Sequence, residues 1–332
     1  MIDETFKVKL EPITPTFVWS GEILVHKADY ELIDGKLVIV DMNKAILKVG
    51  KLQDAFREEF AREVQGIKLV FPSATAPREV MMINQYLVPA SSLKGLIRTA
   101  ILNNLSKAKQ KVYKEVYNKV RSNLNALIDP NSKFKTRPKD VGKPVEGLLK
   151  VKVPFGRGIF VYDAMSRLLI GEPKAKDVTL SLSKIKIVET VGNFRAEAYA
   201  ITFDKGELEY EAKIVKPQNY GVHENLRNMD AVITKDAIIE SLKEFSFLVL
   251  DKEKQRVKIA KGETEGLLKD YKQFLNSLKP ESDCFPLKMG MFTGHHAKTV
   301  NVPSDIEQLR KEVLSKVYRN WDSSTVKLVE WN

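Results

Sequence analysis

The chain has 332 residues, 43% hydrophobic and 29% charged, which is the balance of a soluble globular protein long enough for two domains and excludes a largely disordered one. Its 54 Lys and Arg residues outnumber its 43 Asp and Glu residues, and the formal charge of +11 favours a polyanionic partner. Nucleic acid is favoured over a membrane because no amphipathic basic helix is evident, and the single cysteine, Cys284, excludes an internal disulfide framework and a cysteine-based zinc knuckle.

The first 70 residues predict strands followed by a helix. Residues 6–10 alternate apolar and polar side chains, which is typical of a strand, and a proline-punctuated loop then ends at Ser20-Gly21. Asp34-Gly35 lies between two runs of strand-forming residues and predicts a hairpin turn. Residues 43–70 carry charged residues and apolar residues at helical spacing, which predicts a helix.

The central stretch, residues 86–105, predicts a capped helix with one buried stripe. Ser91 and Ser92 follow Pro89 and offer hydroxyls that can cap a helix N-terminus. The helix is expected to continue toward Leu127 and to stop at Asp129-Pro130. The apolar residues at helical spacing are Leu93, Leu96, Ile97, Ala100, Ile101 and Leu105.

A phosphate-binding helix start is one interpretation of the polar residues in this stretch. Lys94 and Arg98 are four residues apart beside the positive end of the helix. Gly95 costs about 1 kcal/mol relative to alanine in a helix interior, and it permits the close approach of another backbone. An ordinary core helix with solvated basic residues explains the same pattern equally well.

The middle of the chain predicts an exposed loop and then strands. Residues 129–147 are rich in Pro, Lys, Asn and Gly and are interpreted as the loop. A strand is expected over 159–163, and Asp163 at its end is interpreted as the cap of the next turn rather than as a catalytic group. Residues 178–190 and 197–214 alternate like two paired strands.

The C-terminal third predicts helices around a glycine-rich loop. Helices are expected at 230–246, 264–278 and, before a terminal strand, within 305–332. In the loop at 285–299, glycines let backbone amides face a phosphate or a base. A Walker phosphate-binding loop is excluded because Ala297, not glycine, precedes Lys298-Thr299.

No signature of catalysis, of a cofactor or of a metal site is found. The sequence lacks GxSxG, HExxH, a CxxC pair and a GxGxxG after a strand. The adjacent His295 and His296 point apart on a strand, and no fourth zinc ligand accompanies them and Cys284. With no signal sequence and no apolar run approaching about 18 residues, a cytoplasmic protein without membrane contact is expected.

Residues 89–98, Pro-Ala-Ser-Ser-Leu-Lys-Gly-Leu-Ile-Arg, resemble the P-G-S-S-x-K-G-x-x-R signature of the RAMP superfamily, the RNA-binding subunits of CRISPR effector complexes, with Ala90 in place of the usual glycine. The segments 10–41, 159–166 and 285–299 resemble further motifs of that family in the same order. Within the family, the first of these segments is similar to a RAMP subunit of the type III-A CRISPR (Csm) complexes.

This resemblance implies an α+β fold of two RRM-like (ferredoxin-like) modules with antiparallel sheets, elaborated by helices and loops. We divide them as residues 1–170, with a long basic helix, and 171–332, with the glycine-rich loop. It also implies a non-catalytic subunit that binds guide RNA (crRNA) near the 3′ end and caps the filament of backbone RAMP subunits. The implied partners are crRNA, other Csm subunits, chiefly the backbone RAMP, and target RNA as a further candidate.

Two alternatives stay open, a RAMP subunit of a type III-B (Cmr) complex and a metal-independent guide-RNA-processing endoribonuclease of the same fold. The second usually has an N-terminal histidine, for which His26 is the only early candidate, and no partner for it is evident in the sequence. The RAMP that cuts target RNA uses an early aspartate, whereas this chain has Glu22 there and no aspartate between it and Asp29.

Carried onto this chain, the motifs predict RNA contacts from hydroxyls, cations and glycines. Phe17, Trp19 and Phe292 are aromatic candidates for base stacking, with burial in the core as the alternative. The predicted RNA-binding residues are Ser20, Gly21, Ser91, Ser92, Lys94, Gly95, Arg98, Arg157, Lys288, Gly290, Gly294, His295 and Lys298.

Overall fold

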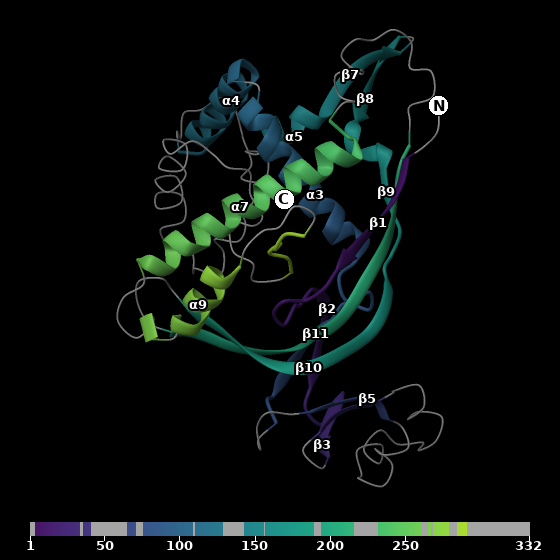
Figure 1. Ribbon diagram of the computed structural model, residues 1–332, viewed down its shortest axis with the longest axis vertical. Coiled ribbons are helices and arrows are strands. Elements are labelled where there is room, and N and C mark those ends of the chain that lie inside the picture. Colours follow the sequence, from purple (N-terminus) through teal and green to yellow (C-terminus); the bar gives the residue numbers. More distant parts are fainter. Residues whose placement is uncertain are drawn as a thin grey trace.

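The computed structural model has an α+β fold in which helices cover one side of a strongly curved sheet (Figure 1). This confirms the fold class predicted from the sequence. The residues that the structure describes are 4–33, 36–40, 65–70, 76–108, 110–128, 143–155, 157–188, 194–215, 232–259, 265–266, 268–278 and 284–290.

The largest sheet in the described part of the chain has six strands centred on β11 (Phe194–Ile214). The order is β1 (Glu4–Leu10), β11, β6 (Glu79–Ile83) and β2 (Trp19–Val25), and both β9 (Leu168–Ile170) and β10 (Lys174–Val188) also pair with β11. These pairs are antiparallel, as predicted, except that β6 runs parallel to β11. The sheet therefore joins strands from both sides of residue 170, and the division into two modules there remains a prediction.

Two smaller sheets complete the described strands. β3 (Tyr30–Ile33) and β4 (Lys36–Val40) are antiparallel with Ile33 opposite Lys36, which confirms the hairpin predicted at Asp34-Gly35. β5 (Gln65–Val70) pairs with β4, so the helix predicted over 43–70 is wrong for its last six residues, where Ile67 and Leu69 alternate with polar residues. The rest of that predicted helix lies outside the described residues. β7 (Lys150–Phe155) and β8 (Gly158–Asp163) form a separate hairpin.

The long helices α3 (Ala90–Ala108) and α7 (Lys235–Lys258) contact each other on the concave side of the β10–β11 ribbon (Figure 1). α4 (Gln110–Ile128) follows α3, so the stretch predicted as one helix from Ser92 to Leu127 is helical wherever it is described, and residue 109 between the two elements lies outside the described residues. The other described helices are the short α5 (Lys143–Glu146), η3 (Gly147–Leu149) and η4 (Ala164–Arg167), and α9 (Lys269–Ser277).

Two of the helices predicted in the C-terminal third are present with different bounds. α7 begins after Thr234, whose side chain accepts a hydrogen bond from the Ala237 N–H, and it extends well past residue 246. The extension follows the apolar period, because Val249 and Val257 continue the buried side of the helix. α9 lies within the helix predicted at 264–278, and the elements predicted at 305–332 lie outside the described residues.

One hydrophobic core joins α3, α7 and the inner face of the sheet. The stripe predicted on α3 is buried, with Leu93, Ile97 and Ala100 at most 1% exposed. Burying one such Leu or Ile side chain stabilises the fold by about 1.5–3 kcal/mol. Its partners in the core are Phe203, Leu208 and Tyr210 of β11 and Ile238, Leu242 and Phe245 of α7.

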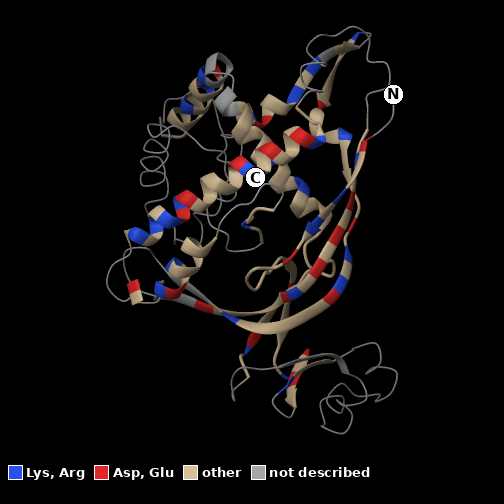
Figure 2. Cartoon of the chain, viewed as in Figure 1, with Lys and Arg blue, Asp and Glu red and all other residues tan. Residues whose placement is uncertain are grey.

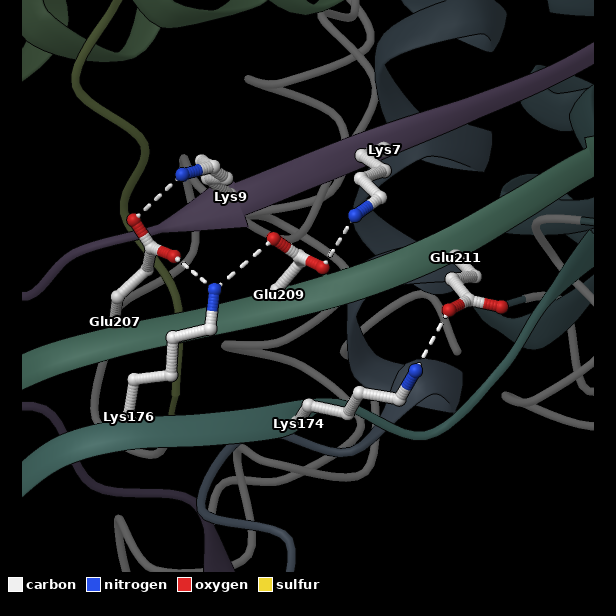
Figure 3. A network of polar contacts seen from close by, with 7 residues as sticks. All are labelled: Lys7, Lys9, Lys174, Lys176, Glu207, Glu209 and Glu211. Atoms are coloured by element: carbon white, nitrogen blue, oxygen red, sulfur yellow. Dashed lines mark hydrogen bonds and ion pairs between the residues drawn. The ribbon is translucent and has the colours of Figure 1, made fainter.

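The opposite face of the sheet carries a network of paired charges (Figure 3). Glu207, Glu209 and Glu211 alternate along β11 with the core residues Leu208 and Tyr210, as a strand with one face on the core requires, and Glu209 is itself only 8% exposed. The Glu209 carboxylate lies 2.8 Å from Lys7 Nζ of β1 and 3.3 Å from Lys176 Nζ of β10. These cations hold the pKa of Glu209 at about 2.

The same pattern extends along the strands. Glu207 pairs with Lys9 at 3.0 Å and with Lys176 at 3.4 Å, and Glu211 pairs with Lys174 at 2.7 Å. All three glutamates have pKa values below the ordinary one, chiefly through hydrogen bonds from these lysines. We call these four lysines and three glutamates the paired charge face, because each lysine in it is matched by a carboxylate.

We expect the free energy of unfolding to fall at acid pH because of this face. A carboxylate whose pKa is depressed in the folded state contributes stability above its unfolded pKa of about 4.3, and that stability is lost as the pH falls toward the folded value. Urea unfolding at neutral pH and near pH ~3 should show the loss, and Glu209→Gln should make it smaller. The control is Glu79→Gln, an exposed glutamate on β6. An acid loss that is equal in both variants would contradict the role of Glu209.

Candidate RNA-binding surface

Helix α3 begins at Ala90, and a carboxylate from another element caps it. The Ala90 N–H donates to Glu172 Oε2 at 2.8 Å, and the Ser92 N–H donates to the Pro89 carbonyl at 2.9 Å. The predicted cap by Ser91 and Ser92 is therefore wrong, and both serines lie inside the first turn. A negative charge is favourable at the N-terminus of a helix. Because the Glu172 carboxylate accepts the hydrogen bond from the Ala90 N–H, this amide is not free to bind a phosphate.

The next face of α3 is open toward solvent. Ser91 and Gly95 are exposed, and Lys94 and Arg98 are partly exposed. A Cβ atom added at Gly95 would meet nothing within 4 Å. Gly95 would allow another backbone to approach closely, but no described residue of this chain does so. The space beside Gly95 is therefore available to a partner.

Asp163 joins α3 to the root of the β7–β8 hairpin. Arg98 Nη2 donates to Asp163 Oδ2 at 3.2 Å, and the Met165 N–H donates to Asp163 Oδ1 at 2.9 Å. The second bond confirms the prediction that Asp163 caps the following turn. Partial burial lowers the pKa of Lys94, a shift that Asp163 opposes and Arg98 reinforces, so Lys94 and Arg98 share one electrostatic environment.

Arg157 lies in the turn of the same hairpin, where it is exposed. Six residues at about 3.4 Å each place this turn roughly 20 Å from the root at Asp163. Lys150 and Lys152, which the sequence analysis missed, are exposed on β7, and the register places Lys150 opposite Asp163 at the root and Lys152 opposite Val161 farther out. Figure 2 shows basic residues on this strand. Their signal in the sequence is the alternation Lys-Val-Lys-Val at 150–153.

These cations line up along two connected elements and define what we call the α3–hairpin surface. Lys152 and Arg157 form no ion pair with any described residue, in contrast to the lysines of the paired charge face. The surface consists of Ser91, Ser92, Lys94, Gly95 and Arg98 of α3 and Lys150, Lys152 and Arg157 of the hairpin.

Ser20 and Gly21 form a β-bulge on β2 rather than part of this surface. Ser20 Oγ donates to the Met82 carbonyl at 3.0 Å and accepts from the Glu22 N–H at 3.1 Å, and the pairing of β2 with β6 shifts at this point. Gly21 has φ +98°, a conformation that favours glycine. Trp19 beside the bulge is 39% exposed, and its indole N–H donates to the Glu22 carbonyl at 2.9 Å.

Gly290 lies against Phe17, in the segment just before β2. It has φ +96°, and a Cβ there would lie 2.3 Å from the Phe17 carbonyl oxygen. The close backbone approach predicted for this glycine is therefore found inside the chain, toward Phe17. Phe17 itself is a core residue at 5% exposure, so of the aromatic residues proposed for stacking only Trp19 is seen exposed.

Lys288 is held by a buried carboxylate. Its Nζ lies 3.0 Å from Glu253 Oε2, and the side chain of Glu253 is only 6% exposed. Glu253 also pairs with Arg256 at 3.4 Å and accepts from the Tyr271 hydroxyl at 3.2 Å. Burial, and then the charge of Glu253, raises the pKa of Tyr271. Removing Lys288 would leave the buried Glu253 carboxylate with fewer partners, which is costly for a buried charge. We therefore favour a structural role for Lys288, in which it anchors its segment to α7.

The structure therefore separates the predicted residues into two groups, the α3–hairpin surface and the region of the β2 bulge and residues 288–290. Gly294, His295 and Lys298 lie outside the described residues, as does Phe292. Among the described residues, no three His, Cys, Asp or Glu side chains gather closely enough to hold a metal ion. No helix in this part of the chain is long and apolar enough to cross a membrane.

His26 has partners that the sequence did not reveal. Its Nε2 lies 2.9 Å from Glu31 Oε1, and its ring centroid is 5.3 Å from that of Tyr30. Tyr30 is fully buried and donates its hydroxyl proton to the Pro77 carbonyl. Burial, with Glu31 adding to it, raises the pKa of Tyr30 to about 12, so its hydroxyl is unsuited to proton transfer at neutral pH.

A scan against known protein families and a search of curated proteins both find no match. Among solved structures, the fold is similar to that of a chain in the cryo-EM structure of a Csm–crRNA–target RNA ternary complex from a type III-A CRISPR-Cas system. The two chains are 17% identical, the similarity covers 96% of this chain and 90% of the other, and the TM-score is 0.61.

A second solved structure with a similar fold is the crystal structure of Csm5 from T. onnurineus. The identity is 15%, the similarity covers 82% of this chain and 88% of Csm5, and the TM-score is 0.54. At these identities the likeness establishes a shared fold. It agrees with the fold that the sequence motifs implied.

Proposed function

We propose that this chain is a non-catalytic crRNA-binding subunit of a type III-A Csm complex, the counterpart of Csm5, which caps the 3′ end of the guide RNA beside the backbone RAMP. The observation that carries this proposal is a fold shared over 96% of the chain with a chain from a Csm–crRNA–target RNA complex. The four sequence motifs, at 10–41, 89–98, 159–166 and 285–299, support the same assignment.

The distribution of charge supports RNA as the ligand of the α3–hairpin surface. On the paired charge face, three carboxylates offset the charge of four lysines, so this face offers little net attraction to a polyanion. The α3–hairpin surface carries five cations, and the two carboxylates described beside it are engaged, Asp163 by Arg98 and Glu172 by the Ala90 N–H. Phosphate contacts by such cations give sequence-independent grip, as binding to guides of varied sequence requires.

A binding role without catalysis is supported by the residues around the two candidate reactive groups. Glu22 occupies the position at which the RNA-cutting RAMP has its aspartate. Its backbone N–H donates to Ser20 Oγ and its carbonyl accepts from the Trp19 indole, both within the β2 bulge. Tyr30, the tyrosine beside His26, is buried and donates its hydroxyl proton to a backbone carbonyl, so it is not available to act with His26. The hydrogen bond from His26 to Glu31 is the one observation that favours the endoribonuclease alternative.

The proposal is tested by expressing the chain with its genomic neighbours, purifying through a tagged backbone subunit, and crosslinking the chain to bound RNA. We expect the chain to co-purify with Csm subunits and its crosslinks to lie near the crRNA 3′ end. Co-purification with Cmr subunits would favour the first alternative. Cleavage of repeat RNA in EDTA that is lost in His26→Ala would favour the endoribonuclease, and either result would overturn the proposal.

A further inference from the structure

The β7–β8 hairpin leaves the body of the protein and exposes apolar side chains on both of its faces. It projects beyond the helices and the main sheet (Figure 1), and within the described residues its strands pair only with each other. Ile159, Phe160 and Val161 are 69%, 50% and 50% exposed. Successive strand residues point to opposite faces, so this run shows that neither face of the outer half is covered.

Within the described part of the chain, the hairpin is anchored at its root. Tyr162 is 4% exposed and belongs to the core, and Asp163 is tied to Arg98 of α3. Three consecutive large apolar side chains in solvent are unusual on a two-stranded ribbon, which is itself marginally stable when isolated. Such a concentration of exposed apolar surface is typical of a partner-binding element.

The charge on the hairpin indicates what kind of partner it fits. Register places Lys152 opposite Val161 and Lys150 opposite Asp163, and Arg157 lies in the turn. Directly opposed residues share a face, so Lys152 lies beside exposed apolar surface. The partner should therefore combine negative charge with flat apolar surface. Single-stranded RNA does so because its bases are unpaired beside its phosphates, whereas a duplex hides its base faces.

We propose that the outer half of the β7–β8 hairpin binds single-stranded RNA on both of its faces, with bases packing on Phe160 on one face and on Ile159 and Val161 on the other, and with phosphates contacting Lys152 and Arg157. The proposal rests on the RNA-binding function proposed above and adds the element that contacts bases. It predicts that the chain distinguishes single-stranded from duplex RNA through apolar contacts, while the α3 cations bind phosphates of either form.

The test is fluorescence anisotropy of the purified full chain with a labelled single-stranded RNA and with a duplex of equal length. The variant Ile159→Thr with Phe160→Thr removes apolar surface and retains strand propensity. We expect its affinity for the single strand to fall on the order of 10-fold to 100-fold, since base stacking on an aromatic is worth about 1–3 kcal/mol per base. Binding to the duplex should change little, and the salt dependence should be unchanged because no charge is removed.

Two further variants make the result specific. Phe247→Thr removes a side chain that is 47% exposed on α7 and should leave RNA binding unchanged. Phe160→Trp keeps an aromatic surface, so it should bind like the parent and its added emission should change on addition of single-stranded RNA. This second variant reports contact even if the threonine variant disturbs the hairpin.

The outcomes separate this inference from the proposed function. If the parent chain binds no RNA, both proposals fail. If the parent binds, Lys94→Ala with Arg98→Ala weakens binding, and the hairpin variants behave like the parent, only the hairpin proposal fails. It also fails if the threonine variant loses single-stranded and duplex RNA equally, or if it keeps RNA and no longer co-purifies with neighbouring subunits, because the hairpin would then be a protein contact.

Discussion

Replacing both Lys94 and Arg98 by alanine should weaken the binding of single-stranded RNA on the order of 10-fold to 100-fold at moderate salt. A hydrogen bond to a charged group contributes about 1.5–3 kcal/mol, and part of it is already used because Arg98 pairs with Asp163. The dependence of affinity on salt should also fall, by about 0.7 in logarithmic slope for each lost phosphate contact with a single strand. A salt titration of the variant beside the parent measures both effects.

The free energy of unfolding of this double variant should change little. Both side chains of the Arg98–Asp163 pair are 31% exposed, and ion pairs at such sites contribute about 0–1 kcal/mol. Lys114→Ala with Lys119→Ala is a matched control, since it removes the same charge from exposed positions on α4. Equal losses of RNA affinity in the two double variants would show that net charge alone acts, and a large loss of melting temperature would show that this α3 face is structural.

A third variant resolves the part played by Asp163. Removing Arg98 leaves the negative charge of Asp163 unpaired near the RNA. Part of the affinity lost in the double variant is therefore due to repulsion between this carboxylate and the RNA phosphates. Asp163→Asn alone should therefore bind RNA more tightly than the parent, with a hydrogen bond from the Met165 N–H still possible. Unchanged or weaker binding by Asp163→Asn would indicate that the carboxylate is needed to orient Arg98.

Periodicity made much of the fold predictable from the sequence. The buried stripe of α3, the pairing of β10 with β11 and the pairing of β3 with β4 each follow from local patterns that the tertiary structure reinforces. What was missed depends on residues far apart in the chain. The α3 cap comes from Glu172, 82 positions away from Ala90, and no local pattern around Ser91 reports it.

The candidate site was only partly predictable for the same reason. The motif resemblance led to Lys94, Arg98 and Arg157. In the structure, Arg98 binds Asp163 at the root of the hairpin whose turn carries Arg157. It also led to Lys288 and Gly290, whose nearest partners, Glu253 and Phe17, could be known only from the structure. The exposure of the hairpin was missed because an apolar run at 159–161 predicts a buried strand whenever its surroundings are unknown.

Two glycines of the predicted site should respond to alanine with opposite signs. Gly290→Ala should lower the free energy of unfolding by about 3 kcal/mol or more, because alanine is strained at φ +96° and its Cβ would lie 2.3 Å from the Phe17 carbonyl oxygen. Gly95→Ala should raise it by about 0.5–1 kcal/mol, because Gly95 is helical and a Cβ there meets nothing within 4 Å.

The RNA affinity of the Gly95→Ala variant then decides why the chain tolerates glycine in the first turns of α3. If RNA approaches the helix backbone there, the variant should be more stable than the parent and bind single-stranded RNA more weakly, a combination that a purely structural glycine does not give. Urea unfolding and anisotropy on the same preparations measure the two quantities. Gly21→Ala is the intermediate case, since φ +98° strains the new side chain while nothing lies within 4 Å of it, so its stability loss should be about 1 kcal/mol and smaller than that of Gly290→Ala. A Gly95→Ala variant that is more stable and binds RNA like the parent would remove Gly95 from the α3–hairpin surface and leave Lys94 and Arg98 as its contacts on the helix.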